Sequence, residues 1–504
     1  MRHGFALLLT FVGIALAAVA AADDAAPLGA YNIDLNQTTV SGISSGAFMA
    51  VQFGVAHSEA VRGVAATAGG PYFCVGEDAI RQASASRRAL THCMQGDPSQ
   101  GTPVPITAAE LAARRKTTQR WAAQGLIGPW AALQRQVFWL FHGYNDGIVK
   151  KPVSDALERW LSSIAPPSRV FYRDDLPAAH AQISPSCGAG SCQPCAQTGG
   201  DFINTCLVAG EAYDPAGAAL QMFYGPLQRT ATETLHGRLQ SFAQDPFVSV
   251  RGHAPLLDAG DIAMGETGYV YVPDDCSNGA PCRLHIAFHG CLQSADVLED
   301  RFARLAGFNE WADANRIVVL YPQARKTYGV LTQPANPLGC WDWWGYNDVP
   351  FETPGRFATR EGDQIATVWR MAQRLAADFV AVPAAPQAGA TPTLTLLDVS
   401  STAAALRGVP VSGAYQYRVT RTGGGASADS GPLDEPLFVD RGLKPATAYG
   451  WTLHAYDAAG HEIAASVEID GSTDPAPPPC DPYYSFMSNQ TVDAHGNPTD
   501  KTCH

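Results

Sequence analysis

The sequence of 504 residues has no long apolar run after residue 21. A transmembrane helix needs roughly 20 consecutive apolar residues, so we expect no membrane-spanning segment in the mature chain. Basic runs are also missing, and the formal net charge is −13. This charge disfavours nucleic acid as a partner and suits a neutral or apolar substrate better. Internal repeats and coiled-coil heptads are not found either, so neither a solenoid nor a fibrous fold is expected.

The one long apolar run, residues 5–21, follows Arg2 and His3 and precedes small residues. This pattern is typical of a secretory signal peptide, cleaved here near residues 20–22. The alternative, a membrane anchor, needs a longer run with different flanks. We therefore expect residues 1–22 to be removed, leaving a secreted chain without a membrane anchor, either extracellular or periplasmic. A monomer is expected.

Twelve cysteines fit an oxidising compartment, where disulfides persist. Neighbours in sequence suggest four pairs: Cys74 with Cys93, Cys276 with Cys282, Cys291 with Cys340, and Cys480 with Cys503. A second group contains a C-x-x-C and could form a four-thiolate zinc site or a redox pair. It consists of Cys187, Cys192, Cys195 and Cys206. In an oxidising compartment we favour two disulfides there, and we expect no metal.

Residues 27–380 alternate between strand-like and helix-like segments, which predicts one α/β domain. The strand-like runs are apolar and end in glycine, proline or polar loops, as parallel strands buried on both faces do. They cover residues 62–70, 136–143, 284–290 and 316–324. Helical patterns cover residues 107–124 and 361–379.

The remaining chain divides into three parts. Residues 381–392 are rich in alanine and proline and form an expected linker. Residues 393–474 contain short, aromatic-rich strands between turns, which predicts a small all-β sandwich. Its segment 443–449, with Leu443, Pro445, Thr447 and Tyr449, resembles the tyrosine corner of fibronectin type III modules, although an unrelated sandwich stays an alternative. Residues 475–504 combine a proline-rich stretch with a tail too short to fold without its disulfide.

A G-x-S-x-G motif spans residues 42–46, with Ser44 at its centre. Its glycines permit a sharp strand-to-helix turn that lifts the Ser44 hydroxyl out of a sheet. The preceding residues 36–42 are strand-like and the following residues 47–58 are helix-like. This context favours Ser44 as a nucleophile over an ordinary turn serine.

A serine nucleophile needs a histidine base, which in turn needs a carboxylate to orient it. Asp146 and His180 each lie on a loop after a strand-like run, and the order Ser, Asp, His is the one expected of α/β-hydrolases. Asp174 and Asp175 are rival acids, but they lie only five or six residues before His180, which is the poorer geometry. The alternatives are a turn aspartate at 146 and a surface histidine at 180.

The oxyanion loop poses a problem of order. In the usual arrangement it precedes the nucleophile, yet only residues 23–43 stand between the signal peptide and Ser44. Two His-Gly pairs remain, at 142–143 and at 289–290, and the first is followed by the acid. The second would direct the backbone N–H groups of Cys291 and Ser45 at the developing oxyanion. The sheet would then be circularly permuted, because strands that normally come first would follow the histidine.

Six segments together resemble the short-chain-length polyhydroxyalkanoate (polyhydroxybutyrate) depolymerases, whose α/β-hydrolase domain is permuted. In chain order they read SGISSGAFMAVQF, HGYNDGIV, LPAAHA, AYDPAGAALQMFYGPL, AFHGCLQS and NPLGCWDWWGY. The resemblance covers residues 30–380. It implies Ser44 as nucleophile, Asp146 as acid, His180 as base, and Cys291 as an oxyanion donor through its N–H.

The resemblance also implies the reaction. Such enzymes hydrolyse the ester bonds of poly(3-hydroxybutyrate) through an acyl-enzyme, without a cofactor. Trp341, Trp343 and Trp344 offer flat apolar faces that could bind polyester beside the nucleophile. The alternative is that they belong to the core, and we expect at least one to be buried.

The chain departs from this family at its C-terminal end. Members that attack crystalline polymer usually continue into a dedicated polymer-binding domain, whereas here only the short tail follows the sandwich. The expected partner is polyester polymer or 3-hydroxybutyrate oligomers, and this departure favours amorphous polymer or soluble oligomers over crystalline granules without deciding between them. Two other functions stay open: a carbohydrate esterase of the feruloyl or acetyl-xylan kind, and an inactive surface-binding protein. The coexistence of Ser44, Asp146 and His180 argues against the second.

Overall fold

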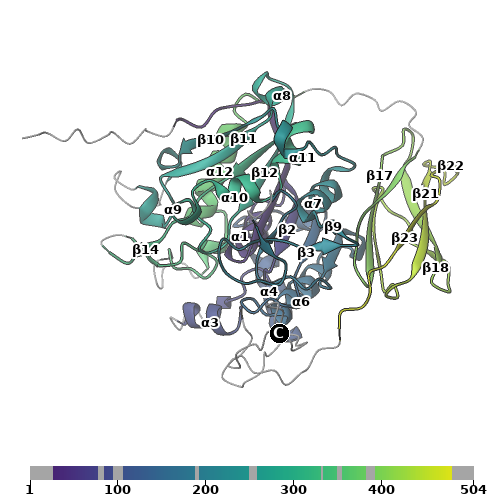
Figure 1. Cartoon of the computed structure of the whole chain (residues 1–504), viewed down its shortest axis with the longest axis horizontal. Helices are drawn as coiled ribbons and strands as arrows, with labels where there is room; N and C mark the ends of the chain where they lie inside the picture. The colour runs from purple at the N-terminus through teal and green to yellow at the C-terminus, as the bar shows by residue number, and fades with distance from the viewer. Residues whose placement is uncertain are drawn as a thin grey trace, which may run out of the picture.

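A computed structural model describes residues 26–77, 84–94, 106–187, 192–248, 258–330, 333–348, 355–381 and 392–478. The predicted signal peptide, the Cys480–Cys503 pair and nearly all of the predicted linker lie outside these residues. Figure 1 shows an α/β domain with a smaller β-sandwich beside it. Within the described ranges, no helix combines the length and apolar character needed to cross a membrane.

The α/β domain is built on an eight-stranded sheet with the strand order β10-β11-β13-β12-β1-β2-β3-β4. All neighbouring strands run parallel except β11, which is antiparallel to both β10 and β13. The strands are β1 (Ile33–Ile43), β2 (Val61–Thr67), β3 (Val137–Phe141), β4 (Val170–Arg173), β10 (Arg238–Ala243), β11 (Thr267–Val272), β12 (Cys282–Phe288) and β13 (Ile317–Tyr321). Strands β10 to β13 follow His180 in the chain yet complete the sheet beyond β1, which confirms the predicted permutation.

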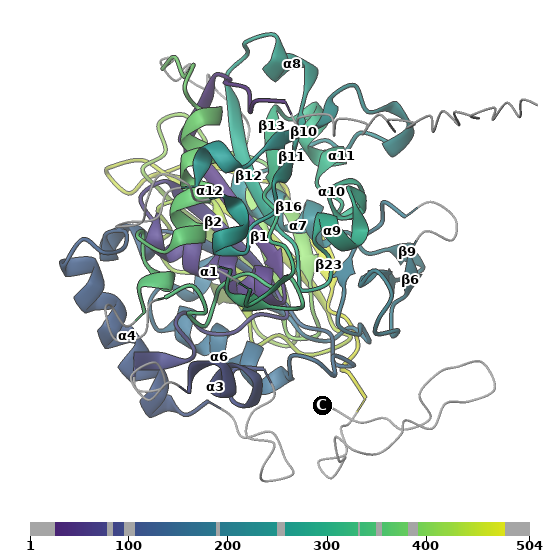
Figure 2. The same cartoon turned by 90° about the vertical axis from the view of Figure 1, so that its left-hand side faces the viewer.

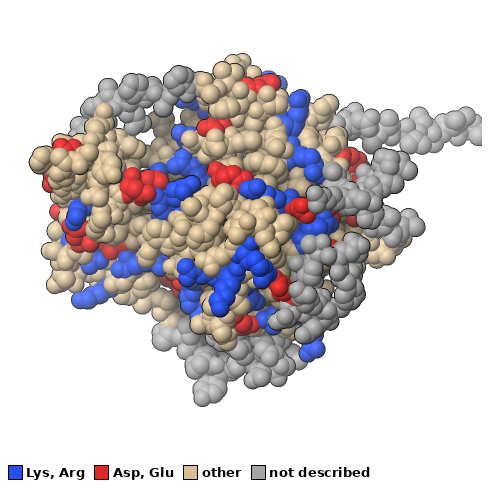
Figure 3. Space-filling model, turned by 180° about the vertical axis from the view of Figure 1, so that it is seen from behind, with Lys and Arg blue, Asp and Glu red and all other residues tan. Residues whose placement is uncertain are grey.

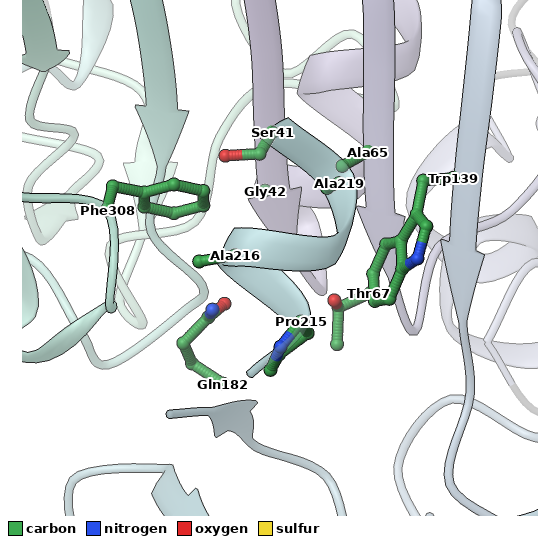
Figure 4. A pocket seen from close by; sticks show the side chains of 10 residues that line it. All are labelled: Ser41, Gly42, Ala65, Thr67, Trp139, Gln182, Pro215, Ala216, Ala219 and Phe308. Atoms are coloured by element: carbon green, nitrogen blue, oxygen red, sulfur yellow. The ribbon is translucent and has the colours of Figure 1, made fainter. Parts of the chain in front are cut away.

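Helices cover both faces of the sheet (Figure 2). One face carries α1 (Ser45–Ala56), α4 (Ala108–Ala123), α6 (Lys151–Ser162) and α12 (Asp363–Leu375), and the other α7 (Pro215–Tyr224), α10 (Arg301–Leu305) and α11 (Asn309–Ala314). Every residue of α1 is buried, as expected of a helix that is apolar on all sides. Between α7 and the sheet lies a cavity of about 10 Å³, lined by residues that include Ser41, Thr67 and Gln182 (Figure 4). It has room for about one water molecule.

Shorter elements form the loops at the ends of the sheet. The helices are α3 (Ala85–Thr91), α5 (Trp130–Leu133), α8 (Asp274–Ser277) and α9 (Ala295–Leu298). The strands are β5 (Gln182–Ile183), β6 (Gln193–Pro194), β7 (Ile203–Thr205), β8 (Leu207–Val208), β9 (Glu211–Ala212), β14 (Thr327–Tyr328) and β15 (Ala335–Asn336).

The sandwich packs two antiparallel sheets around Trp451 and Leu453, which are fully buried. One sheet holds β16 (Leu394–Val399), β17 (Ala403–Gly408) and β20 (Leu437–Arg441). The other holds β18 (Gln416–Gly423), β19 (Ala428–Asp429), β21 (Ala448–Tyr456), β22 (Glu462–Ala465) and β23 (Ile469–Ser472). The Lys444 N–H donates to the Tyr449 hydroxyl at 2.9 Å, which is the predicted tyrosine-corner contact.

Five disulfides join the cysteines of the described residues; they confirm three of the predicted pairs and the expectation of two disulfides in the second group, whose pairing the sequence leaves open. They are Cys74–Cys93, Cys187–Cys192, Cys195–Cys206, Cys276–Cys282 and Cys291–Cys340. The four thiols of the alternative zinc site are thus all engaged in disulfides.

The pairing of β1 with β12 joins the first part of the domain to the part that follows the histidine. His285 of β12 is central to this pairing. Its Nδ1 lies 2.8 Å from the Thr39 hydroxyl and its Nε2 lies 2.8 Å from the Ser41 hydroxyl, both on β1. Burial lowers the pKa of His285 to about 3, so the ring stays neutral in the folded chain.

This buried histidine predicts a pH-dependent difference between two proteins. The unfolded chain binds a proton on His285 below about pH 6.5 and the folded chain does not, so stability is lost as the pH falls. The free energy of unfolding of wild type minus that of His285→Gln should therefore fall by about 2 kcal/mol between about pH 7 and about pH 5. Urea unfolding at both pH values measures this difference, and a difference that does not change with pH would contradict the prediction.

Candidate active site

Ser44 occupies the turn between β1 and α1. Its φ of 57° lies in a region that L residues rarely adopt, and such strain gathers at functional sites. The turn touches the end of β12 so closely that a Cβ on Gly46 would lie 2.3 Å from the Phe288 carbonyl oxygen. Only glycine fits there. The second glycine of the G-x-S-x-G motif is thus required by contact with a strand that comes over 200 residues later in the chain.

Asp146 and His180 lie on the loops that follow β3 and β4. His180 Nδ1 donates to Asp146 Oδ2 at 2.8 Å, and both side chains are buried. Because a carboxylate only accepts, this contact leaves His180 Nε2 without the ring hydrogen and able to act as a base. Asp146 Oδ1 accepts the N–H groups of Ile148 at 2.8 Å and Val149 at 3.0 Å. Burial raises the pKa of Asp146, but His180 and these hydrogen bonds outweigh burial and hold that pKa below its usual value.

The acid loop, residues 142–149 after β3, and the histidine segment, residues 174–180 after β4, pack directly on each other. The Tyr144 N–H donates to the Leu176 carbonyl at 3.0 Å, and the Asn145 N–H donates to the Ala178 carbonyl at 3.2 Å. A Cβ on Gly143 would lie 2.1 Å from that Ala178 oxygen, so the approach requires glycine. The spacing of Asp146 and His180 therefore depends on how the histidine segment is held.

The two rival acids have other partners. Asp174 lies 2.8 Å from the Lys151 ammonium, and Asp175 pairs with Arg173 at 3.2 Å. Among the described residues, neither carboxylate forms a hydrogen bond or an ion pair with His180, whereas Asp146 does. The geometry thus favours Asp146 over both rivals.

The loop after β12 lies beside Ser44, where the permuted sheet predicts the oxyanion loop. A Cβ on Gly290 would lie 3.4 Å from the Ser44 Cβ, and Ser44, Ser45 and Cys291 line one common cavity. Ser45 is the first residue of α1, a position whose N–H has no acceptor within the helix. The arrangement brings together the residues expected to stabilise an oxyanion.

Sequence reasoning missed Gln293, which connects this loop to the segment beside His180. Its Oε1 accepts the Gly290 N–H at 2.8 Å, and its Nε2 donates to the Phe202 carbonyl at 2.9 Å. The Phe202 ring stands edge-on to His180, with ring centroids 6.2 Å apart. Gln293 lies within the AFHGCLQS segment, but a single loop glutamine carries no distinctive spacing that would have singled it out.

A cavity of about 440 Å³ opens at Ser44 and has a mainly apolar lining. Phe48 and Trp343 stack in its wall with ring centroids 4.1 Å apart, and Trp344 meets Trp343 edge-on at 5.1 Å. Helix α3 contributes Ala89 and Leu90, which are distant in sequence from every motif and could not have been assigned to the site from sequence. The cavity could hold an uncharged, apolar chain next to the nucleophile.

Trp341 confirms the expectation that at least one of the three tryptophans is buried, but it contradicts the assignment of this residue to the substrate site. It is fully buried and packs against Phe288, at 5.0 Å between ring centroids, and against His289, at 5.3 Å. A side chain with no exposed surface cannot contact a substrate, so the predicted substrate contact of Trp341 is wrong. It supports the loop after β12 instead. Trp343 and Trp344 do line the cavity.

The face opposite to that of Figure 1 carries charges of both signs. On the face shown in Figure 3, acidic and basic side chains lie close together between broad uncharged areas. Across the described ranges, no group of three or more His, Cys, Asp or Glu side chains is arranged to hold a metal ion.

Comparison with known proteins agrees with this geometry. The chain is 35% identical over 459 residues to a poly(3-hydroxybutyrate) depolymerase of Delftia acidovorans, covering 90% of this chain and 82% of that protein. It is 36% identical over 344 residues to a polyhydroxybutyrate depolymerase of Talaromyces funiculosus, covering 66% of this chain and 88% of the relative. No protein-family model matches the chain.

Solved structures show the same relationship. The crystal structure of a PHB depolymerase from Penicillium funiculosum has a TM-score of 0.56 and 31% identity, covering 70% of this chain and all of that one. A PHB depolymerase complexed with an R3HB trimer matches with the same values. With its permuted α/β-hydrolase sheet and its extensive identity to these proteins, the chain belongs to the polyhydroxybutyrate depolymerases, a family of carboxylic ester hydrolases.

Proposed function

We propose that this chain is a secreted serine esterase that cleaves poly(3-hydroxybutyrate)-type polyesters or their oligomers through an acyl-enzyme on Ser44. The observation that carries the proposal is the His180–Asp146 pair, with its 2.8 Å hydrogen bond, on loops at the same sheet edge as the strained Ser44 turn. The R3HB trimer bound by a structural relative supports a 3-hydroxybutyrate ester as the substrate.

The proposed reaction has two halves. His180 Nε2 takes the proton of Ser44 as its oxygen attacks the ester carbonyl, and the oxyanion accepts the N–H groups of Ser45 and Cys291. Collapse of this intermediate breaks the ester bond, and His180 returns the proton to the departing alcohol. Water then attacks the acyl-enzyme by the same route, releasing a carboxylic acid and free Ser44. Asp146, held ionised, stabilises the imidazolium in both halves.

The apolar lining of the cavity supports a polyester substrate. A polyhydroxybutyrate chain is uncharged and carries short alkyl side groups, so its burial against Phe48, Trp343 and Trp344 is favourable. Disulfides throughout the described residues support an oxidising, extracellular or periplasmic location.

The central test compares wild type with Ser44→Ala on suspensions of amorphous and crystalline polyhydroxybutyrate. Wild type should release 3-hydroxybutyrate and its oligomers, while the variant should lose about 1,000-fold or more of the rate because the nucleophile is gone. An organophosphate should label wild type at Ser44, one adduct per chain. Undiminished release by the variant would overturn the mechanism, and a folded wild type without an adduct would favour the inactive binding protein.

The same preparations distinguish a carbohydrate esterase. Release of ferulate or acetate from xylan, without clearing of amorphous polymer, would replace the polyester with a carbohydrate ester as substrate. Activity confined to amorphous material or soluble oligomers would exclude crystalline polymer as a substrate.

Another prediction concerns the disulfide that holds the oxyanion loop, the loop after β12 that carries Cys291. Cys291 is bonded to Cys340, and the Leu292 N–H donates to the Leu338 carbonyl at 2.8 Å, so the loop is tied to the cavity wall. The double variant Cys291→Ser, Cys340→Ser should lose about tenfold in kcat through loosening of the oxyanion donors. The matched control, Cys276→Ser with Cys282→Ser, removes a disulfide at the start of β12. Equal kcat values in the two variants would show that the clamp has no catalytic role.

A prediction for the substrate site concerns Trp344, which is half-buried in the cavity wall. Trp344→Ala should remove about 1.5 kcal/mol of aromatic contact with the substrate. KM for 3-hydroxybutyrate oligomers would then rise about tenfold. The control is Trp130→Ala, since Trp130 is also half-buried but does not line this cavity. Steady-state kinetics on a soluble 3-hydroxybutyrate trimer give the KM of both variants. An unchanged KM in Trp344→Ala would show that this residue does not bind the substrate.

A further inference from the structure

The sandwich is docked on the α/β domain through buried polar contacts that converge on Asp398 of β16. Asp398 Oδ1 accepts Arg173 Nη1 at 2.7 Å. Its Oδ2 accepts the Tyr213 hydroxyl at 2.6 Å and Trp139 Nε1 at 3.1 Å. All four residues are buried. A buried carboxylate with this many donors from another domain has one favoured position, because any shift leaves a buried charge without a partner.

Apolar packing surrounds these contacts. Side chains of β3, β4 and α7 form one cluster with Ala403, Ala405, Leu437 and Val439 of the sandwich. In Figure 1 the sandwich lies next to the side of the α/β domain that carries β9 and α7. The sandwich is therefore part of the same packed body as the sheet edge at β4.

Arg173 is the last residue of β4, and the chain that leaves it carries His180. The Arg173 side chain also contacts Asp175 and a second sandwich carboxylate, Asp474. The Asp175 carboxylate accepts the backbone N–H of Ser401 of the sandwich. Arg173 and Asp175, which flank the start of the histidine segment, are thus both hydrogen-bonded to the sandwich.

The other side of this segment faces the acid loop. The Arg173 carbonyl accepts the His142 N–H at 2.9 Å, and further backbone hydrogen bonds from residues 144 and 145 follow along the segment. The segment therefore lies between the acid loop and the sandwich, and a displacement at Arg173 would be passed to the His180–Asp146 pair.

We propose that Asp398 of the sandwich is a positioning residue of the active site, which acts through Arg173 to hold the segment that carries His180. The sandwich would then contribute to catalysis in the α/β domain rather than serve only as a spacer. This inference rests on the proposed role of His180 as the base.

The test uses the full-length protein and two matched variants. Asp398→Asn keeps the size of the side chain but replaces one acceptor oxygen with an NH2 group, which only donates. Either Arg173 or the pair Trp139 and Tyr213 then loses its acceptor, and the negative charge is removed. Asp440→Asn is the control, because Asp440 is equally buried in the sandwich and accepts Trp451 Nε1 at 2.8 Å and Arg421 at 2.9 Å, both within the sandwich.

Hydrolysis of a soluble p-nitrophenyl butyrate ester and phosphorylation of Ser44 by an organophosphate are the two readouts. Asp398→Asn should lower kcat and the phosphorylation rate by about tenfold or more, because small misplacements of a catalytic group have effects of this order. The KM of Asp398→Asn should stay within about twofold of the wild-type value. In Asp440→Asn the kcat, the KM and the phosphorylation rate should all stay within about twofold of wild type.

Wild-type values of kcat and phosphorylation rate in folded Asp398→Asn would overturn the inference, as would an equal loss in Asp440→Asn. If Asp398→Asn does not fold, Asp474→Asn replaces it, since Asp474 is partly exposed and shares Arg173. A loss of about threefold in kcat at unchanged KM is then expected, and an unchanged kcat overturns the inference. The proposed function fails separately, by the absence of a Ser44 adduct in wild type.

Discussion

The parallel pairing of β1 with β12 is the interaction on which the active site depends. Gly42 of β1 stands opposite Phe288 of β12, so the two strands end at the same level of the sheet. The turn with Ser44 and the loop with Cys291 therefore emerge side by side. Gly46 permits their close contact, and His285 holds the two strands together through hydroxyls of β1. Without this pairing, Ser44 and Ser45 would be separated from Cys291, the other expected oxyanion donor, which lies in the later half of the chain.

The docking of the sandwich is a second constraint, and it acts at β4, an edge strand of the sheet, rather than at its centre. A buried ion pair contributes little net stability, because the cost of desolvating both charges offsets their attraction. Its directional hydrogen bonds nevertheless favour one orientation of the two partners. We interpret the Arg173–Asp398 pair in this way, as a contact that defines how the sandwich meets β4. Apolar packing around this pair stabilises the contact between the two domains, and the charged pair determines their relative orientation.

The cavity combines an apolar wall with polar groups gathered at one end. Phe48, Trp343 and Trp344 form the wall, while Ser44 and Cys291 lie where the reaction is proposed to occur. This division suits a substrate that is apolar along its length and reacts at an ester carbonyl. The loops that make the wall are tied down by the Cys291–Cys340 disulfide and by Gln293, which also reaches the segment next to His180.

The sequence by itself determined the features that are encoded within a few neighbouring residues. The G-x-S-x-G turn, the strand-like and helical segments, the permuted order of the sheet and the tyrosine corner of the sandwich could all be predicted. So could three of the five cysteine pairs of the described residues, whereas the pairing among Cys187, Cys192, Cys195 and Cys206 is decided only by the structure. The structure brings Asp146 and His180 together as the loop positions suggested, although their catalytic roles stay predictions.

Only the tertiary structure decided which side chains meet across long separations. Trp341 lies within the same motif as Trp343 and Trp344, yet packing against Phe288 buries it, and the motif alone could not distinguish the three. Arg173 and Asp398 are 225 residues apart, and nothing near either residue in sequence indicates the other. The physical reason is that local patterns report backbone conformation and burial, whereas a contact between distant residues depends on how whole elements pack.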